Sequence, residues 1–65
     1  MAHILDVIAP PSRTIEQAEK AIGWKSSITL GDKAWFVFQN KYEALESYAV
    51  LCRRGFKLNL SYKKS

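Results

Sequence analysis

The stretch GDKAWFVFQN at residues 31–40 decides the fold of this chain. Gly31–Lys33 predicts a turn, and Ala34–Gln39 is rich in the aromatic and β-branched residues that are typical of strands. Asn40–Arg54 then predicts a helix that begins at an Asn cap, and Gly55 ends it. Phe56–Tyr62 alternates apolar and polar residues without a break, which indicates a second strand. These elements predict a small α+β domain.

The first half of the chain adds two strands and a helix. His3–Ile8 is nearly all apolar, as expected of a central strand, and two prolines follow it closely. Thr14 and Gln17 form a capping-box pattern that opens a short amphipathic helix ending near Ile22. Ser27–Leu30 predicts a short strand, joined as a hairpin to the aromatic strand.

The predicted order is therefore β-α-β-β-α-β, the split βαβ pattern of ferredoxin-like folds. We expect a compact two-layer ferredoxin-like domain with an antiparallel sheet and two helices on one face. If Ser27–Leu30 is not a strand, the alternative is a three-stranded sandwich of the same two layers.

Length and composition restrict the class of protein. Sixty-five residues predict one domain, spanning residues 1–65, with room for one small core. Cys52 is the only cysteine, which excludes an internal disulfide and favours a reducing compartment. No signal peptide or membrane-spanning apolar run is visible, so we expect a cytoplasmic protein without a membrane partner.

Charge is concentrated at the C-terminal end. The formal net charge is +4, but residues 1–50 carry −1 and residues 51–65 carry +5, with no acidic residue among the latter. A basic end of this kind attracts nucleic acid or an acidic protein surface, and it also favours solubility and complements the end of a helix. The cations of this end are Arg53, Arg54, Lys57, Lys63 and Lys64.

Helices on one side of the sheet leave the other side open. In the aromatic strand we expect Phe36 and Phe38 to point toward the helices and Trp35, Val37 and Gln39 to point outward. In the last strand the apolar set faces the helices, and the outward set is Lys57, Asn59, Ser61 and Lys63. The candidate binding residues are Trp35, Gln39, Arg53, Arg54, Lys57, Asn59, Lys63 and Lys64.

A resemblance to the RNA-recognition motif rests on residues 35–44. Trp35–Phe38 followed by Asn40–Ala44 is similar to the aromatic strand and helix entry of that family, and Ile4–Pro11 is similar to its first strand. The resemblance implies base stacking on an open sheet face. The chain is shorter than the family, and it lacks both the glycine of the aromatic-strand motif and an aromatic residue in the first strand. We therefore do not assign it to that family.

Catalytic patterns are absent from the sequence. His3 is the only histidine, Cys52 is predicted on the inner face of the second helix, and no pair of carboxylates stands out as general acid and base. One His and one Cys do not suffice for a zinc site, and no glycine-rich phosphate loop is present. We expect no enzyme activity, no cofactor and no metal.

Two binding functions remain. The first is a small regulatory or inhibitor protein, such as those that phages and mobile elements carry, which binds a larger protein with an acidic surface. The alternative is binding of RNA or single-stranded DNA through the open sheet face and the basic end. We expect a monomer or weak dimer in either case. Homo-oligomerisation through the open face is a third hypothesis.

Overall fold

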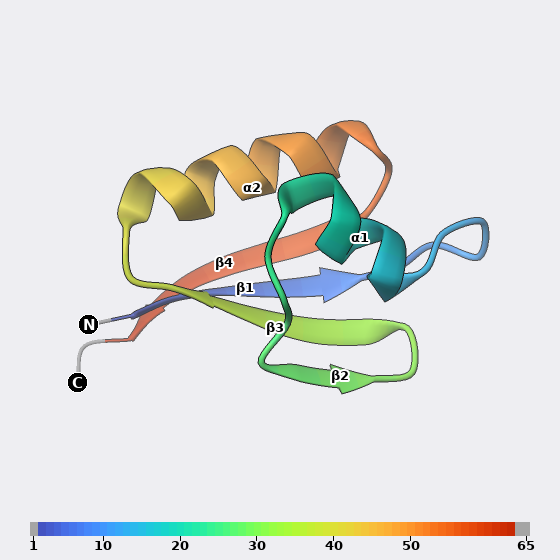
Figure 1. The fold of residues 1–65 in the computed structure, drawn as a ribbon, viewed down its shortest axis with the longest axis horizontal. Helices are drawn as coiled ribbons and strands as arrows, with labels where there is room; N and C mark the ends of the chain where they lie inside the picture. Colours follow the sequence, from blue (N-terminus) through green and yellow to red (C-terminus); the bar gives the residue numbers. More distant parts are fainter. Residues whose placement is uncertain (1, 64–65) are drawn as a thin grey trace.

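Strand β1 lies at the centre of the fold, between the last two long strands of the chain. The computed structural model describes residues 2–63 (Figure 1). The elements are, in chain order, β1 (Ala2–Ile8), α1 (Ile15–Ile22), β2 (Ile28–Leu30), β3 (Lys33–Phe38), α2 (Lys41–Arg53) and β4 (Lys57–Lys63). All six elements predicted from the sequence are present, with ends that differ by one or two residues.

The sheet is four-stranded and antiparallel, with the order β2-β3-β1-β4. Leu5 of β1 lies opposite Phe36 of β3 on one side and opposite Leu60 of β4 on the other. Beyond the end of β1, the Ala9 N–H donates to the Asp32 carbonyl at 2.7 Å, which extends the pairing into the β2–β3 turn. The short strand β2 is the outer neighbour of β3, as the hairpin pattern predicts.

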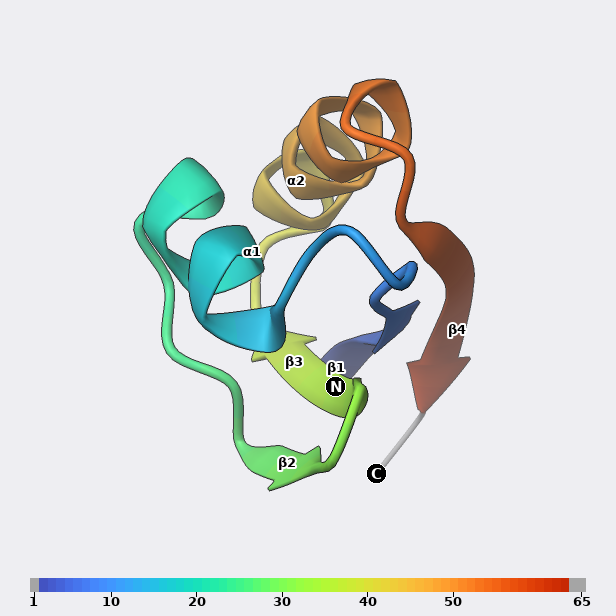
Figure 2. The same ribbon diagram turned by 90° about the vertical axis from the view of Figure 1, so that its right-hand side faces the viewer.

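Both helices lie on one side of the sheet, and the core is between the two layers (Figure 2). The largest fully buried side chains are Phe36, Phe38, Leu5, Leu51 and Val7. The predicted inward position of the two phenylalanines of β3 is therefore confirmed. Helix α2 contacts β1, β3 and β4, and α1 packs beside it.

The local signals that begin and end the helices are confirmed. Thr14 accepts a hydrogen bond from the Gln17 N–H at 3.2 Å, and the Gln17 side chain accepts one from the Thr14 N–H at 3.0 Å. Asn40 accepts one from the Tyr42 N–H at 2.7 Å. Gly23 ends α1 with φ +66°, a left-handed conformation that favours glycine over residues with a Cβ atom.

The apolar face of α2 differs from the prediction. Helical spacing predicts an apolar stripe of Ala44, Leu45, Tyr48, Leu51 and Cys52, but the buried residues are Ala44, Ser47 and Leu51. Cys52 is exposed, and its predicted place on the inner face is wrong. The same spacing places Val50 on the solvent side, whereas it is half-buried beside α1.

The outer edge of β3 is covered by the segment that follows α1. Ser27 lies before β2 and donates its N–H to the Trp35 carbonyl at 2.8 Å. Beyond the reach of β2, the Trp24 indole N–H donates to the Val37 carbonyl at 3.2 Å, and its ring lies 5.1 Å from that of Phe38. Trp24 thus packs on the core and also satisfies a strand-edge carbonyl.

Replacing the Trp24 indole by a phenyl ring tests this edge contact. We expect Trp24→Phe to keep the ring packing and to lower the free energy of unfolding by about 0.5–1.5 kcal/mol, the net value of one hydrogen bond. Urea unfolding measures the change. Trp35→Phe is the matched control and is expected to change stability by less than about 0.5 kcal/mol. Equal losses in the two variants would contradict a role for the indole N–H.

Candidate functional site

The sheet face opposite the helices carries side chains from all four strands. Strand register places residues that lie directly opposite one another on the same side of the sheet. We call this surface the open sheet face. Its members are Ile4, Asp6 and Ile8 of β1, Ile28 and Leu30 of β2, Lys33, Trp35 and Val37 of β3, and Lys57, Asn59, Ser61 and Lys63 of β4.

These side chains form rows across the sheet. One row runs from Ile28 through Trp35 and Asp6 to Asn59. The next row places Leu30 beside Lys33, Ile8 and Lys57. Part of both rows lines one shallow hollow, which includes Asp6, Ile8, Lys33, Trp35 and Asn59.

Large apolar side chains on this face are open to solvent. Ile28 is 56% exposed, Leu30 is 78% exposed and Trp35 is 51% exposed, and the three are neighbours on β2 and β3. Contiguous exposed apolar surface on a small protein marks an interaction site more often than isolated exposed residues do. Of the cations of the face, Lys33 lies beside this apolar group at the turn end of β3, and Lys57 and Lys63 lie at the two ends of β4, on the opposite edge of the sheet.

Asp6 is the acidic residue at the centre of this otherwise apolar and basic surface. Its Oδ1 atom is buried and accepts no hydrogen bond from residues 2–63. Lys33 and Lys57 are its diagonal neighbours on β3 and β4. Residues in such diagonal positions are typically about 7–8 Å apart. A buried acceptor without a donor in the folded chain reduces stability.

The predicted binding residues divide between two places. Trp35, Lys57, Asn59 and Lys63 share the open sheet face, and Gln39 follows directly after β3 and is exposed. Arg53 and Arg54 lie at the end of α2 in the helical layer, so the structure does not bring them to the same surface. Arg54 instead lines a hollow with Arg13 and Lys20 of the α1 region. Lys64 lies outside the described residues.

Several members of the face were not singled out from the sequence. The sequence indicates strands at Ile4, Ile8, Ile28 and Leu30 but not the sheet face on which their side chains lie. It also does not distinguish Asp6 from the other acidic residues. The alternation Ile28-Thr29-Leu30 was the available signal, because it places two large apolar residues on one side of a short edge strand. The register with β3 was needed to show that this side is the open one.

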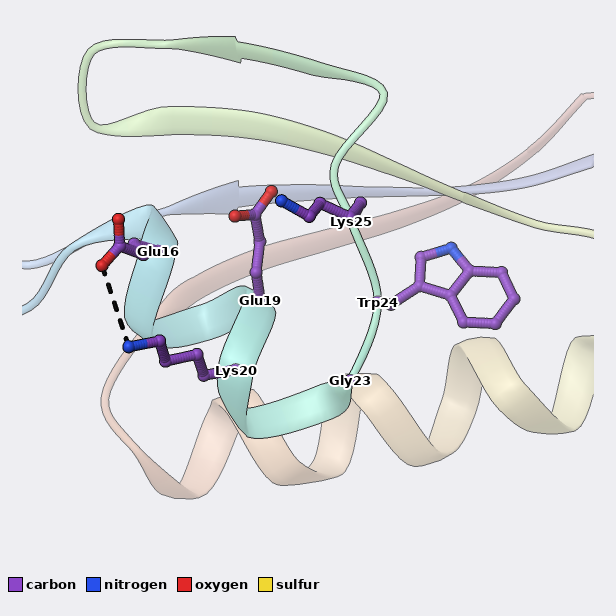
Figure 3. A pocket seen from close by; sticks show the side chains of 6 residues that line it. All are labelled: Glu16, Glu19, Lys20, Gly23, Trp24 and Lys25. Carbon is purple, nitrogen blue, oxygen red and sulfur yellow. Dashed lines mark ion pairs between the residues drawn. The ribbon is translucent and has the colours of Figure 1, made fainter.

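A second hollow lies at the end of α1 and has a structural explanation. Its lining side chains include Glu16, Glu19, Lys20, Trp24 and Lys25 (Figure 3). Glu16 and Lys20 form an ion pair at 4.0 Å, and Glu19 accepts hydrogen bonds from both the N–H and the hydroxyl of Ser26 at 2.9 Å. The ion pair lies within α1, and the Glu19–Ser26 hydrogen bonds fix the segment between α1 and β2, so these charged residues have a structural role.

Residues 2–63 contain neither a membrane-spanning helix nor a metal-binding cluster. No helix in this range is long and apolar enough to span a membrane. No group of three or more His, Cys, Asp or Glu side chains in the same range is placed to hold a metal ion. Comparison of the chain with protein-family models, with curated proteins and with solved structures found no match. The argument for function therefore depends on the open sheet face itself.

Removing the central carboxylate is expected to stabilise the protein. Asp6→Val eliminates an acceptor that has no donor and adds a β-branched side chain to the central strand, so we expect the free energy of unfolding to rise by about 1 kcal/mol. Urea unfolding measures it. Asn59→Val, in the same row but exposed, is the control and is expected to change stability by less than about 0.5 kcal/mol. A clear loss of stability in Asp6→Val would contradict this account of Asp6.

The carboxyl group of Glu19 makes the free energy of unfolding depend on pH. Hydrogen bonds from the Ser26 backbone and hydroxyl lower the pKa of the Glu19 carboxyl below its ordinary value, and the charge of Lys25 adds to the effect. The folded state then binds a proton less readily than the unfolded state, so the contribution to stability is present above about pH 5 and is lost as pH falls through the lowered pKa.

Unfolding measured from pH 6 to pH 3 tests this contribution. Glu19→Gln should be less stable than the parent at pH 6, with a difference that shrinks toward pH 3. Ser26→Ala removes one of the two donors and should give an intermediate result. Ser27→Ala, the neighbouring control, should follow the parent. A constant difference between Glu19→Gln and the parent would rule out the proposed linkage.

Proposed function

We propose that this chain is a small non-catalytic regulatory protein that binds a larger protein through the open sheet face. One observation supports the proposal above the others: Ile28, Leu30 and Trp35 form an exposed apolar group on a sheet face that neither helix covers. Burial of such surface is the main favourable term in protein association. Aromatic residues in this position often contribute most of the binding energy.

The charges of the face indicate the kind of partner. The apolar group lies toward the β2 edge with Lys33 beside it, and Lys57 and Lys63 lie on β4 at the opposite edge. Exposed cations of this kind favour an acidic surface on the partner. The partner surface that fits best is therefore apolar where it meets β2 and β3 and acidic where it meets Lys33 and β4.

We also propose that the fold is a compact version of the ferredoxin-like fold. The strand order β2-β3-β1-β4 supports this assignment, since the chain follows the β-α-β-β-α-β order with antiparallel neighbours. In such a two-layer arrangement the uncovered sheet face is a regular place for ligands and partners.

Binding of single-stranded nucleic acid is the second candidate. Trp35, Lys33 and Asn59 line one hollow, so a base stacked on the indole would lie near a cation and an amide. The carboxylate of Asp6 in the same hollow repels phosphate, and Ile28 and Leu30 have no use in this mode. A protein partner can bury Ile28 and Leu30 together with Trp35, and for that reason we prefer a protein as the partner.

The test is capture of the partner on immobilised full-length protein from a nuclease-treated lysate of its source cells, followed by affinity measurement with the purified partner. Trp35→Ala and Leu30→Glu should each weaken binding about tenfold or more, as hot-spot residues do. Tyr42→Glu, at a residue of α2 that is 78% exposed, is the control and should bind like the parent. Higher salt should weaken binding moderately.

Two results would overturn the proposal. One is equal loss of affinity in Tyr42→Glu and in the open-face variants. The other is recovery of nucleic acid alone, with an affinity for short single strands that falls steeply with salt. The second result would establish the nucleic-acid candidate instead.

A further inference from the structure

The two edges of the sheet differ in how far the rest of the chain covers them. At the β3 edge, β2 pairs with the strand and the Trp24 indole satisfies the Val37 carbonyl beyond it. At the other edge, β4 runs for seven residues and, within residues 2–63, pairs with β1 alone. Alternate N–H and C=O groups of an antiparallel strand point away from its one neighbour. Strand β4 therefore presents a row of backbone groups that suits an added strand.

A groove lies beside this edge, between β4 and the first half of α2. It is lined by His3, Lys41, Leu45, Leu60, Ser61 and Tyr62. Leu45 is 43% exposed and Tyr62 is 49% exposed, and the Tyr62 ring lies 4.8 Å from the His3 ring. The alternation of β4 directs Leu58, Leu60 and Tyr62 to this side. The groove is thus an apolar surface next to an open strand edge.

Helical phase explains why apolar side chains remain exposed here. Lys41, Leu45, Tyr48 and Cys52 recur at the spacing of one helix face, beside the buried row of Ala44, Ser47 and Leu51. This face of α2 looks toward the β4 edge, since Lys41 and Leu45 line the groove there. The sheet ends at β4, so no further strand lies below these side chains.

The charged residues of β4 and of the groove beside it are all cations: Lys57 and Lys63 on the strand and Lys41 in the groove. Asp6 lies on the neighbouring strand β1, diagonal to Lys57, and Glu46 lines a hollow beside α1. No Asp or Glu of residues 2–63 is within ion-pair distance of Lys57 or Lys63.

These charges disfavour a second copy of the chain as the occupant. Two β4 strands that pair antiparallel about Leu60 place Lys57 of each copy opposite Lys63 of the other. Like charges directly opposite each other are destabilising, and lysines at an exposed edge are a usual protection against self-pairing. An acidic strand in the same place forms two opposite-charge pairs instead.

We propose that β4 and the adjoining groove bind an extended acidic segment of another protein by strand addition. Residues of the segment opposite Leu58, Leu60 and Tyr62 are apolar and turn toward the groove. Residues opposite Lys57 and Lys63 are acidic and lie on the other side of the extended sheet. This site shares Lys57 and Lys63 with the open sheet face, but its apolar contacts lie in the groove on the helix side of the sheet. Variants of Trp35 and of Leu45 therefore distinguish it from the proposed function.

The probe is a blocked heptapeptide with the sequence Glu-Val-Thr-Val-Thr-Val-Glu, which gives the same pairs in either strand direction. It is titrated into ¹⁵N-labelled full-length protein. We expect the amide signals of β4 and of the groove residues His3, Leu45 and Tyr62 to shift. We also expect slower hydrogen exchange at the β4 amides that point away from β1. The matched peptide with Lys at both ends should bind about tenfold more weakly. A central proline should abolish binding, because it removes a ladder donor.

Charge reversal on the protein gives the sharper test. The double variant Lys57→Glu/Lys63→Glu changes exposed residues, and it should prefer the Lys-ended peptide over the Glu-ended one. Leu45→Ser should weaken both peptides, and Tyr42→Ser, on the solvent side of the same helix, should bind like the parent. Trp35→Ala should also bind like the parent, which separates this site from the open sheet face.

Three results would overturn the inference. They are the absence of shifts up to the solubility limit of the peptide, equal binding of the two peptides to parent and double variant, and shifts confined to Trp35 and its neighbours. Shifts of β4 signals that depend on protein concentration without peptide would assign the edge to a second copy, and would likewise contradict the proposal.

Discussion

The placement of β1 between β3 and β4 is the constraint on which the rest of the structure depends. Its register pairs Ala2 with Lys63 and Ile4 with both Val37 and Ser61, so the first strand holds the last one in place across nearly the whole described chain. Closing so long a loop costs chain entropy, which the buried side chains of Leu5 and Val7 must offset. Neither the helical layer nor the groove beside β4 exists without this pairing.

Small size then determines which surfaces are left open. A chain of 65 residues supplies two helices, one of them only eight residues long, and both cover the same side of the sheet. The opposite side has no second layer, so Trp35, Ile28 and Leu30 remain in solvent. These exposed residues of the described chain are the surface that we propose a partner buries.

One edge of the sheet is likewise covered and the other is open. The β3 edge is covered by β2 and by the Trp24 side chain, whereas β4 ends the sheet beside an apolar face of α2. Lysines at both ends of β4 act against pairing with another copy and favour an acidic strand. The open sheet face and the β4 edge therefore have different physical preferences: the first favours a broad apolar surface, the second an extended segment.

Local signals in the sequence determined the elements and their ends. The Thr14–Gln17 capping box, the Asn40 cap and Gly23 act over one helical turn, and the alternation of Phe56–Tyr62 acts within one strand. The inward position of Phe36 and Phe38 was predictable for the same reason. Of the candidate site, Trp35, Lys57, Asn59 and Lys63 were predicted correctly as outward residues of their strands.

Only the tertiary structure decided how these residues combine. It brought Lys41 to the groove beside β4, placed Asp6 in one row with Trp35 and Asn59, and left Arg53 and Arg54 in the other layer. It also exposed Cys52 and half-buried Val50, because the position of α1 and the end of the sheet at β4 set which sides of α2 are covered. Periodicity gives the phase of a helix or strand, but its neighbours depend on long-range packing, which no local pattern encodes.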